Sequence, residues 1–343
     1  MKVSVINALY SQFTKVPPVE TADLTGRSVL VVGANTGIGL EAAKHFARMN
    51  PGRLILGCRN QAKGTAAVTC IEKDTGFKGT ELWSIDLSSF SNIIEFAEKF
   101  ERDGVRLDIL VMNAAILTLN YEATADGYES TLQVNHLGTS LLSLLLLPSL
   151  LRTANEASTV SRLVIVSSDS HYFADITKEE QASPNILAKL NSKEYCTTSV
   201  MQQRYSVTKL LNIFFTRALN ARILSSAPLI VDTPNPGFCD SELRRELPFP
   251  LSTINRVAER MLAFTTEEGS RQLVYAAVGG NEEPSKMRGA YINLGNVQEV
   301  SDFVLSAEGG AAQERIWTET IDCLAEVTPL VRKIVDRYLS AVA

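Results

Sequence analysis

A tyrosine and a lysine stand four residues apart in the segment Tyr205-Ser206-Val207-Thr208-Lys209. In a helix, side chains at this spacing lie on one face, one turn apart. An ammonium group beside a phenol favours the phenolate and lowers the pKa of the phenol. A tyrosine tuned in this way can pass a proton to or from a carbonyl or alcohol oxygen near neutral pH. The same spacing also fits an exposed tyrosine beside a lysine whose charged end reaches solvent, so other features of the chain must decide.

A glycine-rich segment, Gly33-Ala-Asn-Thr-Gly37-Ile-Gly39, stands far upstream of the tyrosine. It lies between an apolar run at residues 28–32 and a helical pattern at residues 40–49. Glycines in this context permit a tight turn and a close approach of the backbone to a pyrophosphate, although they also occur in purely structural turns. The start of the next helix supplies free N–H groups and the positive end of its dipole. We therefore predict a dinucleotide site that includes Gly33, Asn35, Thr36, Gly37, Ile38 and Gly39.

The rest of the chain alternates short apolar runs with helical patterns. Continuous apolar strands between helices indicate a parallel sheet covered on both faces. Right-handed crossovers then give a doubly wound sheet, the α/β Rossmann fold, with helices on both faces. The predicted strands are residues 28–32, 53–57, 80–85, 107–112, 162–166, 228–232 and 290–294. The predicted helices are residues 40–49, 61–74, 90–100, 128–147 and 204–224.

Segments at both ends and two internal stretches do not follow this alternation of strands and helices. They are residues 1–25, 169–203, 238–265 and 296–343, the last of which is mostly helical in pattern. No internal repeat and no low-complexity linker divides the chain. We therefore expect a single domain over residues 1–343, with a Rossmann core at 26–295 and a C-terminal helical extension at 296–343.

The composition argues against several classes of function. The net charge is -5 and no block of basic residues occurs, so nucleic acid is not an expected partner. Five cysteines, odd in number and scattered, suggest neither a disulfide framework nor a zinc site. Reduced thiols in a cytoplasmic setting are the default expectation. The histidines at 45, 136 and 171 are too dispersed to suggest any metal centre.

The most apolar stretch of the chain, residues 141–151, is short for a membrane span. We interpret it as part of a buried helix, with contact to a membrane as the remote alternative. Residues 1–15 lack a continuous apolar run and do not have the pattern of a secretory signal.

Taken in order, the motifs resemble those of the short-chain dehydrogenase/reductase family. The glycines have its G-x-x-x-G-x-G spacing, and Tyr205 and Lys209 match its Y-x-x-x-K. The resemblance covers roughly residues 25–295, and residues 56–60 are most similar to the retinol dehydrogenase-like branch, especially its fungal members. Departures from the family pattern are Val32, Met112 and Ala115. The remaining matches are Asp86-Leu87, Asn113-Ala114-Ala115, Asn135, Ser167-Ser168, Pro236-Gly237 and Ser241.

The resemblance implies a catalytic tetrad of Asn135, Ser168, Tyr205 and Lys209. Tyr205 exchanges the proton, and Lys209 lowers its pKa and holds the nicotinamide ribose. Ser168, preferred over Ser167, hydrogen-bonds the substrate oxygen, and Asn135 holds a water. Further cofactor contacts are implied for Asp86, Leu87, Asn113, Ala114, Ala115, Pro236, Gly237 and Ser241.

The residue at the end of the second predicted strand indicates whether the cofactor is NAD(H) or NADP(H). An acidic residue there would accept hydrogen bonds from a free ribose 2′-hydroxyl and repel a 2′-phosphate. This chain has Arg59 instead, and a guanidinium pairs well with phosphate. We predict NADP(H) over NAD(H), the alternative being that Arg59 is a solvated surface residue.

The resemblance also implies a substrate lid at residues 238–265, whose apolar residues favour a hydrophobic carbonyl or alcohol as substrate. Tyr172, Phe173 and Phe238 are candidates for the pocket wall, although they could equally pack against an added helix. A monomer is expected, with a dimer as the alternative. The leading hypothesis is ketone or aldehyde reduction in fungal secondary metabolism. A redox-neutral dehydratase, isomerase or cyclase on the same fold stays open, as does a cofactor-sensing protein without turnover.

Overall fold

The structure, a computed structural model, describes residues 12–104, 106–244 and 259–340. Within these residues, strands form one eight-stranded sheet in the order β3-β2-β1-β4-β5-β6-β7-β8. Strands β1 to β7 pair in parallel, and β8 pairs antiparallel with β7. The strands are β1 Ser28–Val32, β2 Arg53–Cys58, β3 Thr80–Ser84, β4 Ile109–Met112, β5 Ser161–Ile165, β6 Leu229–Pro234, β7 Tyr291–Asn293 and β8 Asn296–Gln298. The predicted parallel sheet is confirmed, while the hairpin to β8 was not predicted.

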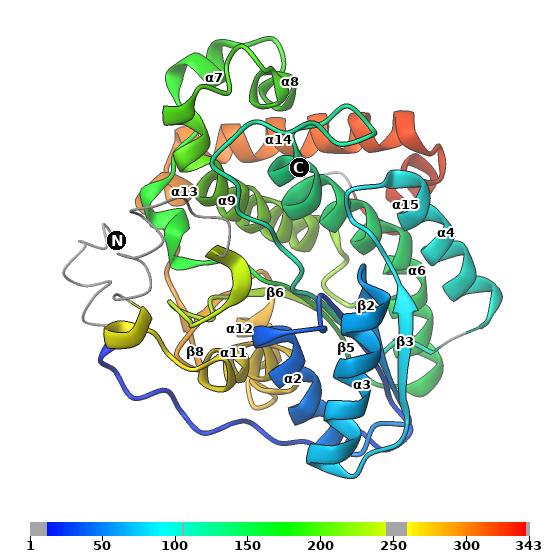
Figure 1. Cartoon of the computed structure of the whole chain (residues 1–343). Coiled ribbons are helices and arrows are strands. Elements are labelled where there is room, and N and C mark those ends of the chain that lie inside the picture. The colour runs from blue at the N-terminus through cyan, green and yellow to red at the C-terminus, as the bar shows by residue number, and fades with distance from the viewer. Residues whose placement is uncertain (1–11, 105, 245–258, 341–343) are drawn as a thin grey trace.

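Helices cover both faces of the sheet (Figure 1). One face carries α2 Gly37–Arg48, α3 Gln61–Thr75 and α11 Thr266–Val278, and the other carries α4 Phe90–Arg102, α6 Thr139–Ala157 and α9 Thr198–Arg222. Within β1, Val29 and Val31 belong to the core between the sheet and α2, α3 and α11. Leu30 and Val32 belong to the core between the sheet and α4, α6 and α9. Successive side chains of a strand point to opposite faces, so a sheet buried on both faces requires a continuous apolar run. The doubly wound fold predicted from sequence is confirmed.

The helix predicted at residues 128–147 is longer and less regular than expected. It comprises α5 Ser130–Leu132, a π-helical turn Gln133–Gly138 and α6, which continues through Pro148 to Ala157. The span Ser130–Ala157 is long and apolar enough to cross a membrane, but 94% of its most apolar window is buried inside the protein. The prediction of a buried helix is therefore confirmed. Gly138 lets this helix approach the chain after β3, because a Cβ there would lie 2.5 Å from the Leu87 carbonyl oxygen.

The helix that carries the tyrosine begins earlier than predicted. The side chain of Thr197 accepts a hydrogen bond from the Val200 N–H and caps α9, which starts at Thr198 rather than at residue 204. Three short helices fill the stretch before it, namely the 3₁₀ helix η2 Asp169–Phe173, α7 Lys178–Ala182 and α8 Ile186–Asn191. Tyr205 consequently lies well inside α9, where the helix backbone fixes its position.

The tail beyond β8 is helical, as predicted, with α13 Asp302–Leu305, α14 Ala307–Val327 and α15 Leu330–Tyr338. α14 packs on α9 and α15 on α6, outside the sheet (Figure 1). The Trp317 ring stacks on Phe215 of α9 at 5.6 Å between centroids, and the Arg222 guanidinium lies 4.6 Å from the Trp317 ring centre. Trp317 therefore packs in the core between α14 and α9.

Candidate active site

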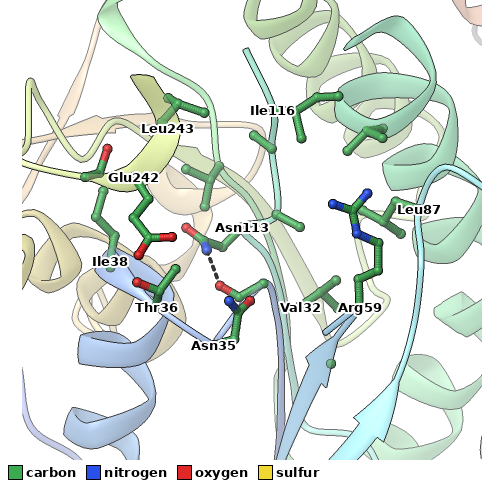
Figure 2. A pocket seen from close by; sticks show the side chains of 18 of the residues that line it. Val32, Asn35, Thr36, Ile38, Arg59, Leu87, Asn113, Ile116, Glu242 and Leu243 are labelled. Carbon is green, nitrogen blue, oxygen red and sulfur yellow. Dashed lines mark hydrogen bonds between the residues drawn. The ribbon is translucent and has the colours of Figure 1, made fainter. Parts of the chain in front are cut away.

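A cavity of about 440 Å³ opens at the carboxyl ends of the strands. It lies where the strand order reverses between β1 and β4, the place at which open α/β sheets bind ligands. Residues predicted from sequence line it from several directions (Figure 2). They are Gly33, Asn35, Thr36, Gly37, Ile38, Arg59, Asp86, Leu87, Asn113, Ala114, Ala115, Tyr205, Lys209, Pro236 and Ser241.

The glycine turn after β1 is locked to the turn after β4. The Asn113 side-chain amide donates to the Gly33 carbonyl oxygen at 2.9 Å, the bond drawn in Figure 2. A Cβ on Gly33 would lie 2.7 Å from the Ala114 backbone, and the φ of Gly33 is +86°. A Cβ on Gly39 would lie 2.2 Å from the Gly33 carbonyl oxygen. Only glycine therefore fits at either position, although Gly39 itself does not line the cavity.

The start of α2 is arranged to receive an anion. No side chain caps this helix at Thr36, so its first N–H groups and the positive end of its dipole face the cavity. Thr36, Gly37 and Ile38 all line the cavity there. Uncapped N–H groups beside close backbone contacts fit the pyrophosphate of a dinucleotide.

Cationic side chains lie at the end of β2. Arg59 is exposed and lines the cavity, and its guanidinium has no hydrogen-bond or ion-pair partner in the part of the chain that the structure describes. Lys63, in the first turn of α3, lines the same wall, and its Nζ lies 2.9 Å from Glu242 Oε2. Sequence reasoning missed Lys63, although its position four residues after Arg59 near a helix start is a signal that could have identified it.

The wall formed by the turns after β3 and β4 is built from backbone and small side chains. Asp86 Oδ1 accepts hydrogen bonds from the Ser88 N–H at 2.9 Å and the Ser88 hydroxyl at 2.6 Å, which fixes the turn. Ile116, also missed from sequence, lines the cavity beside Ala115. The side chain of Asn135 holds Ile116 in place, accepting from its N–H at 2.8 Å and donating to its carbonyl oxygen at 2.9 Å.

Tyr205 and Lys209 meet in the cavity as predicted, but their ionisation differs from the expectation. Lys209 Nζ donates to the Val166 carbonyl oxygen at 2.8 Å and lies 5.5 Å from the centre of the Tyr205 ring. Burial lowers the pKa of Lys209 to about 7. Burial likewise raises the pKa of Tyr205 above its ordinary value. The expected lowering of the Tyr205 pKa by Lys209 is not found in this structure, because burial is the largest influence on the phenol and the charges that shift its pKa are those of Arg244, Asp169 and Cys239.

The two serines after β5 have different partners. Ser167 lines the cavity, and its hydroxyl donates to the Lys209 carbonyl oxygen at 2.8 Å. Ser168 does not line this cavity, and its Oγ contacts Asp169 Oδ1 and the Ser170 N–H, each at 3.1 Å. Asn135 Nδ2, besides its bond to Ile116, donates to Thr208 Oγ1 at 3.1 Å. Asn135 thus joins the turn after β4 to α9 by direct bonds.

The residues predicted for the substrate wall lie elsewhere. Tyr172, Phe173 and Phe238 do not line the cavity. The Tyr172 ring packs 4.0 Å from the His171 ring and its hydroxyl donates to the Glu299 carbonyl oxygen, while the Phe173 side chain is exposed. The Phe238 ring lies 4.3 Å from the Arg244 guanidinium. The Glu299 carbonyl oxygen, which is distant in sequence, therefore holds Tyr172 away from the cavity, whereas Phe238 packs on the nearby Arg244.

Only part of the predicted lid at 238–265 falls within the described residues, since residues 245–258 lie outside them. The 3₁₀ helix η3 Glu242–Arg244 belongs to the described part, and Glu242 and Leu243 from it line the cavity. Gly237 has a φ of +79° and does not line the cavity, whereas its neighbour Pro236 does.

Comparisons with known proteins agree with this geometry. A family model described as short chain dehydrogenase matches residues 27–174. The short-chain dehydrogenase anuD of Penicillium roqueforti is 35% identical, with the match covering 95% of this chain and 85% of that protein. The short chain dehydrogenase sol3 of Alternaria solani is 37% identical, covering 82% and 93% of the two chains. A solved short-chain dehydrogenase from Sphingobium yanoikuyae in complex with NADPH is 21% identical, with a TM-score of 0.52 over 75% of this chain and 85% of its own.

The burial of Lys209 predicts a gain in stability when its charge is removed. A pKa lowered from 10.5 to about 7 destabilises the folded protein by about 4–5 kcal/mol. This destabilisation is complete below pH 7 and decreases as the pH rises toward 10.5. Lys209→Met should therefore stabilise the protein by about 3 kcal/mol at pH 6, after the loss of the hydrogen bond to Val166, and by much less at pH 9. Denaturant unfolding at both pH values measures this.

The matched control is Lys193→Met, which removes an exposed lysine and should leave stability nearly unchanged at both pH values. A Lys209→Met protein that is equally or less stable than the parent at pH 6 would contradict the assigned burial.

Proposed function

The chain belongs to the short-chain dehydrogenase/reductase family of oxidoreductases, and on this premise we propose that it uses NADP(H) to interconvert a carbonyl and an alcohol on a hydrophobic small molecule. The observation that carries the proposal is one shared cavity. The glycine turn, Arg59, Tyr205 and Lys209 all line it at the reversal of strand order. A site for the cofactor and a group able to exchange a proton thus face the same space.

The side chains take separate parts in this reaction. The hydride comes from the bound nicotinamide cofactor, which the protein orients. Tyr205 donates the proton to the carbonyl oxygen in reduction and accepts it in alcohol oxidation. Its raised pKa keeps the phenol protonated at neutral pH, which favours reduction. Ser168 hydrogen-bonds the substrate oxygen and stabilises the charge that develops there, and Lys209 holds the nicotinamide ribose.

The choice of NADP(H) is supported by the wall at the end of β2. Arg59 offers a guanidinium that has no partner among the described residues, and Lys63 adds a second cation four residues further on. A 2′-phosphate would be a partner for both, through the planar fork of the arginine and the point charge of the lysine. Glu242, which also lines the cavity, already pairs with Lys63 at 2.9 Å, so its charge is balanced.

The nature of the substrate is supported by apolar residues that line the same cavity as Tyr205. Ile116, Val134 and Leu243 face the cavity from three different segments. Such a surface favours a hydrophobic carbonyl compound over a sugar or a charged metabolite. The similarity to fungal short-chain dehydrogenases supports a place for the reaction in fungal secondary metabolism.

Replacement of the proposed acid tests the role of Tyr205. Tyr205→Phe should lower kcat for carbonyl reduction by about 10²–10⁴-fold, because proton transfer by a positioned side chain contributes that much. Binding of NADPH, followed by fluorescence titration, should persist. Tyr338→Phe, in α15 and away from the cavity, is the matched control and should retain full activity. A Tyr205→Phe enzyme within tenfold of the parent would remove the tyrosine from the mechanism.

The cofactor assignment rests on charge at the end of β2. Arg59→Asp should raise KM for NADPH by about 10–100-fold, the worth of a lost charge-assisted hydrogen bond, and leave or lower KM for NADH. Steady-state kinetics with both cofactors measures the change. Arg48→Asp makes the same charge change on an exposed residue of α2 and should alter neither KM. Retention of full NADPH preference in Arg59→Asp would refute the assignment.

We also propose that the protein is a monomer. Monomeric carbonyl reductases of the family carry a long insert before the tyrosine, and this chain has 37 residues from Ser168 to Tyr205. In addition, the C-terminal helices cover two long helices of the core, since α14 packs on α9 and α15 on α6. Light scattering coupled to size exclusion should give the mass of one chain, 37.5 kDa. A mass of twice that value would contradict the proposal.

A further inference from the structure

An acidic residue, Asp169, directly follows the serine assigned to the substrate oxygen. It begins η2, which Ser168 caps by accepting the Ser170 N–H at 3.1 Å. The same Ser168 hydroxyl lies 3.1 Å from Asp169 Oδ1 and donates to it. The side chain of Asp169 also acts on Tyr205, since its charge contributes to the raised pKa of that phenol. Asp169 therefore stands beside both groups that the proposed reaction needs.

The hydrogen-bond capacity of Ser168 is limited. A serine hydroxyl has one proton to donate and two lone pairs that accept. One lone pair accepts the Ser170 N–H, and the proton is directed at Asp169 Oδ1. While Asp169 is ionised, Ser168 has no proton left for a carbonyl oxygen of a substrate. If Asp169 carries a proton, it can donate to the second lone pair and leave the Ser168 proton free.

The surroundings of Asp169 shift its ionisation toward higher pH. Burial raises its pKa, against opposing effects from the Ser168 hydroxyl, the backbone N–H of Ser170 and the charge of Arg244. Arg244 is already held by Glu259 at 3.1 Å and by the Cys239 carbonyl oxygen at 3.1 Å. The titratable groups that face Asp169 from packed elements are Tyr172 of η2, Tyr205 of α9, Cys239 after β6, Arg244 of η3 and Tyr291 of β7. Burial raises the pKa of the three tyrosines and of Cys239, so Arg244 is the charged member of this set near neutral pH.

We propose that Asp169 is a positioning residue that sets the direction of the Ser168 hydroxyl, donating to Ser168 Oγ when protonated and withdrawing the Ser168 proton from the substrate oxygen when ionised. The inference rests on the role of Ser168 in the proposed function. Asp169 exchanges no proton with the substrate in this role, so no bond to hydrogen breaks at its carboxyl group and no further reactant is needed. The consequence is that carbonyl reduction weakens as the pH rises through the ionisation of Asp169.

The test compares the pH dependence of kcat/KM for carbonyl reduction in the parent and in Asp169→Asn, between pH 5 and 10. The asparagine amide can donate to Ser168 Oγ at every pH, so the variant should match the parent within about threefold at low pH. The ratio of variant to parent should then rise by at least about tenfold toward high pH, because loss of one such donor costs 10²-fold or more. Lys209 titrates alike in both proteins, because burial alone shifts its pKa. The charge of Asp169 acts on the pKa of Tyr205, so this contribution is separated by repeating the comparison without Ser168.

Further variants separate a role through Ser168 from other effects. Asp169→Ala, which removes the acceptor, should also lose the decline at high pH, and it serves if Asp169→Asn does not fold. In a Ser168→Ala background the ratio should not change with pH. Asp240→Asn removes an exposed carboxylate nearby and should follow the parent profile.

Three results would overturn the inference or its premise. A ratio that stays constant with pH would show that Asp169 does not direct Ser168. A ratio that rises equally in the Ser168→Ala background would show that Asp169 acts on Tyr205 by charge alone. Full activity of Ser168→Ala would instead refute the role of Ser168 in the proposed function, and is recognisable because it does not involve Asp169.

Discussion

The buried ammonium of Lys209 and the end of β5 hold each other by two hydrogen bonds. Lys209 Nζ donates to the Val166 carbonyl oxygen, and the Ser167 hydroxyl donates to the Lys209 carbonyl oxygen, each at 2.8 Å. These bonds fix the middle of α9 to the carboxyl edge of the sheet. Because Tyr205 lies one turn before Lys209, its phenol is fixed with it. The position of the proton-exchanging group thus depends on a contact between a helix and a strand end.

Burial at this contact lowers the stability of the folded protein but suits the proposed role of Tyr205. A charged lysine buried away from water destabilises the folded state. The lowering of the Lys209 pKa to about 7 is a result of this burial. The phenol of Tyr205 shares the burial and stays protonated. A site that is poor for ionised groups is suited to an acid that must keep its proton until a substrate oxygen arrives. Around it, the bond from Asn113 to Gly33 joins the turns after β1 and β4, and Asn135 joins the turn after β4 to α9.

Features signalled by residue types at typical spacings could be predicted from the sequence, whereas a turn with an atypical residue and contacts between distant partners could not. The turn at Gly33 and the strand that precedes it follow from glycine spacing and an apolar run. The hairpin to β8 was missed because its two turn residues have positive φ, and one is Leu294 rather than asparagine or glycine. Tyr172 was misplaced because its partner Glu299 lies far along the chain. The pairing of Lys63 with Glu242 likewise exists only in the folded protein.

The most direct measurement uses NADPH that carries deuterium at the transferable nicotinamide position. The purified protein is incubated with hydrophobic ketones and aldehydes and with an extract of fungal metabolites, and mass spectrometry follows the products. The account predicts an alcohol one deuterium heavier than the product formed with unlabelled NADPH. A product that forms without deuterium, although NADPH binds, would contradict hydride transfer and make a dehydratase, isomerase or cyclase on this fold the better description.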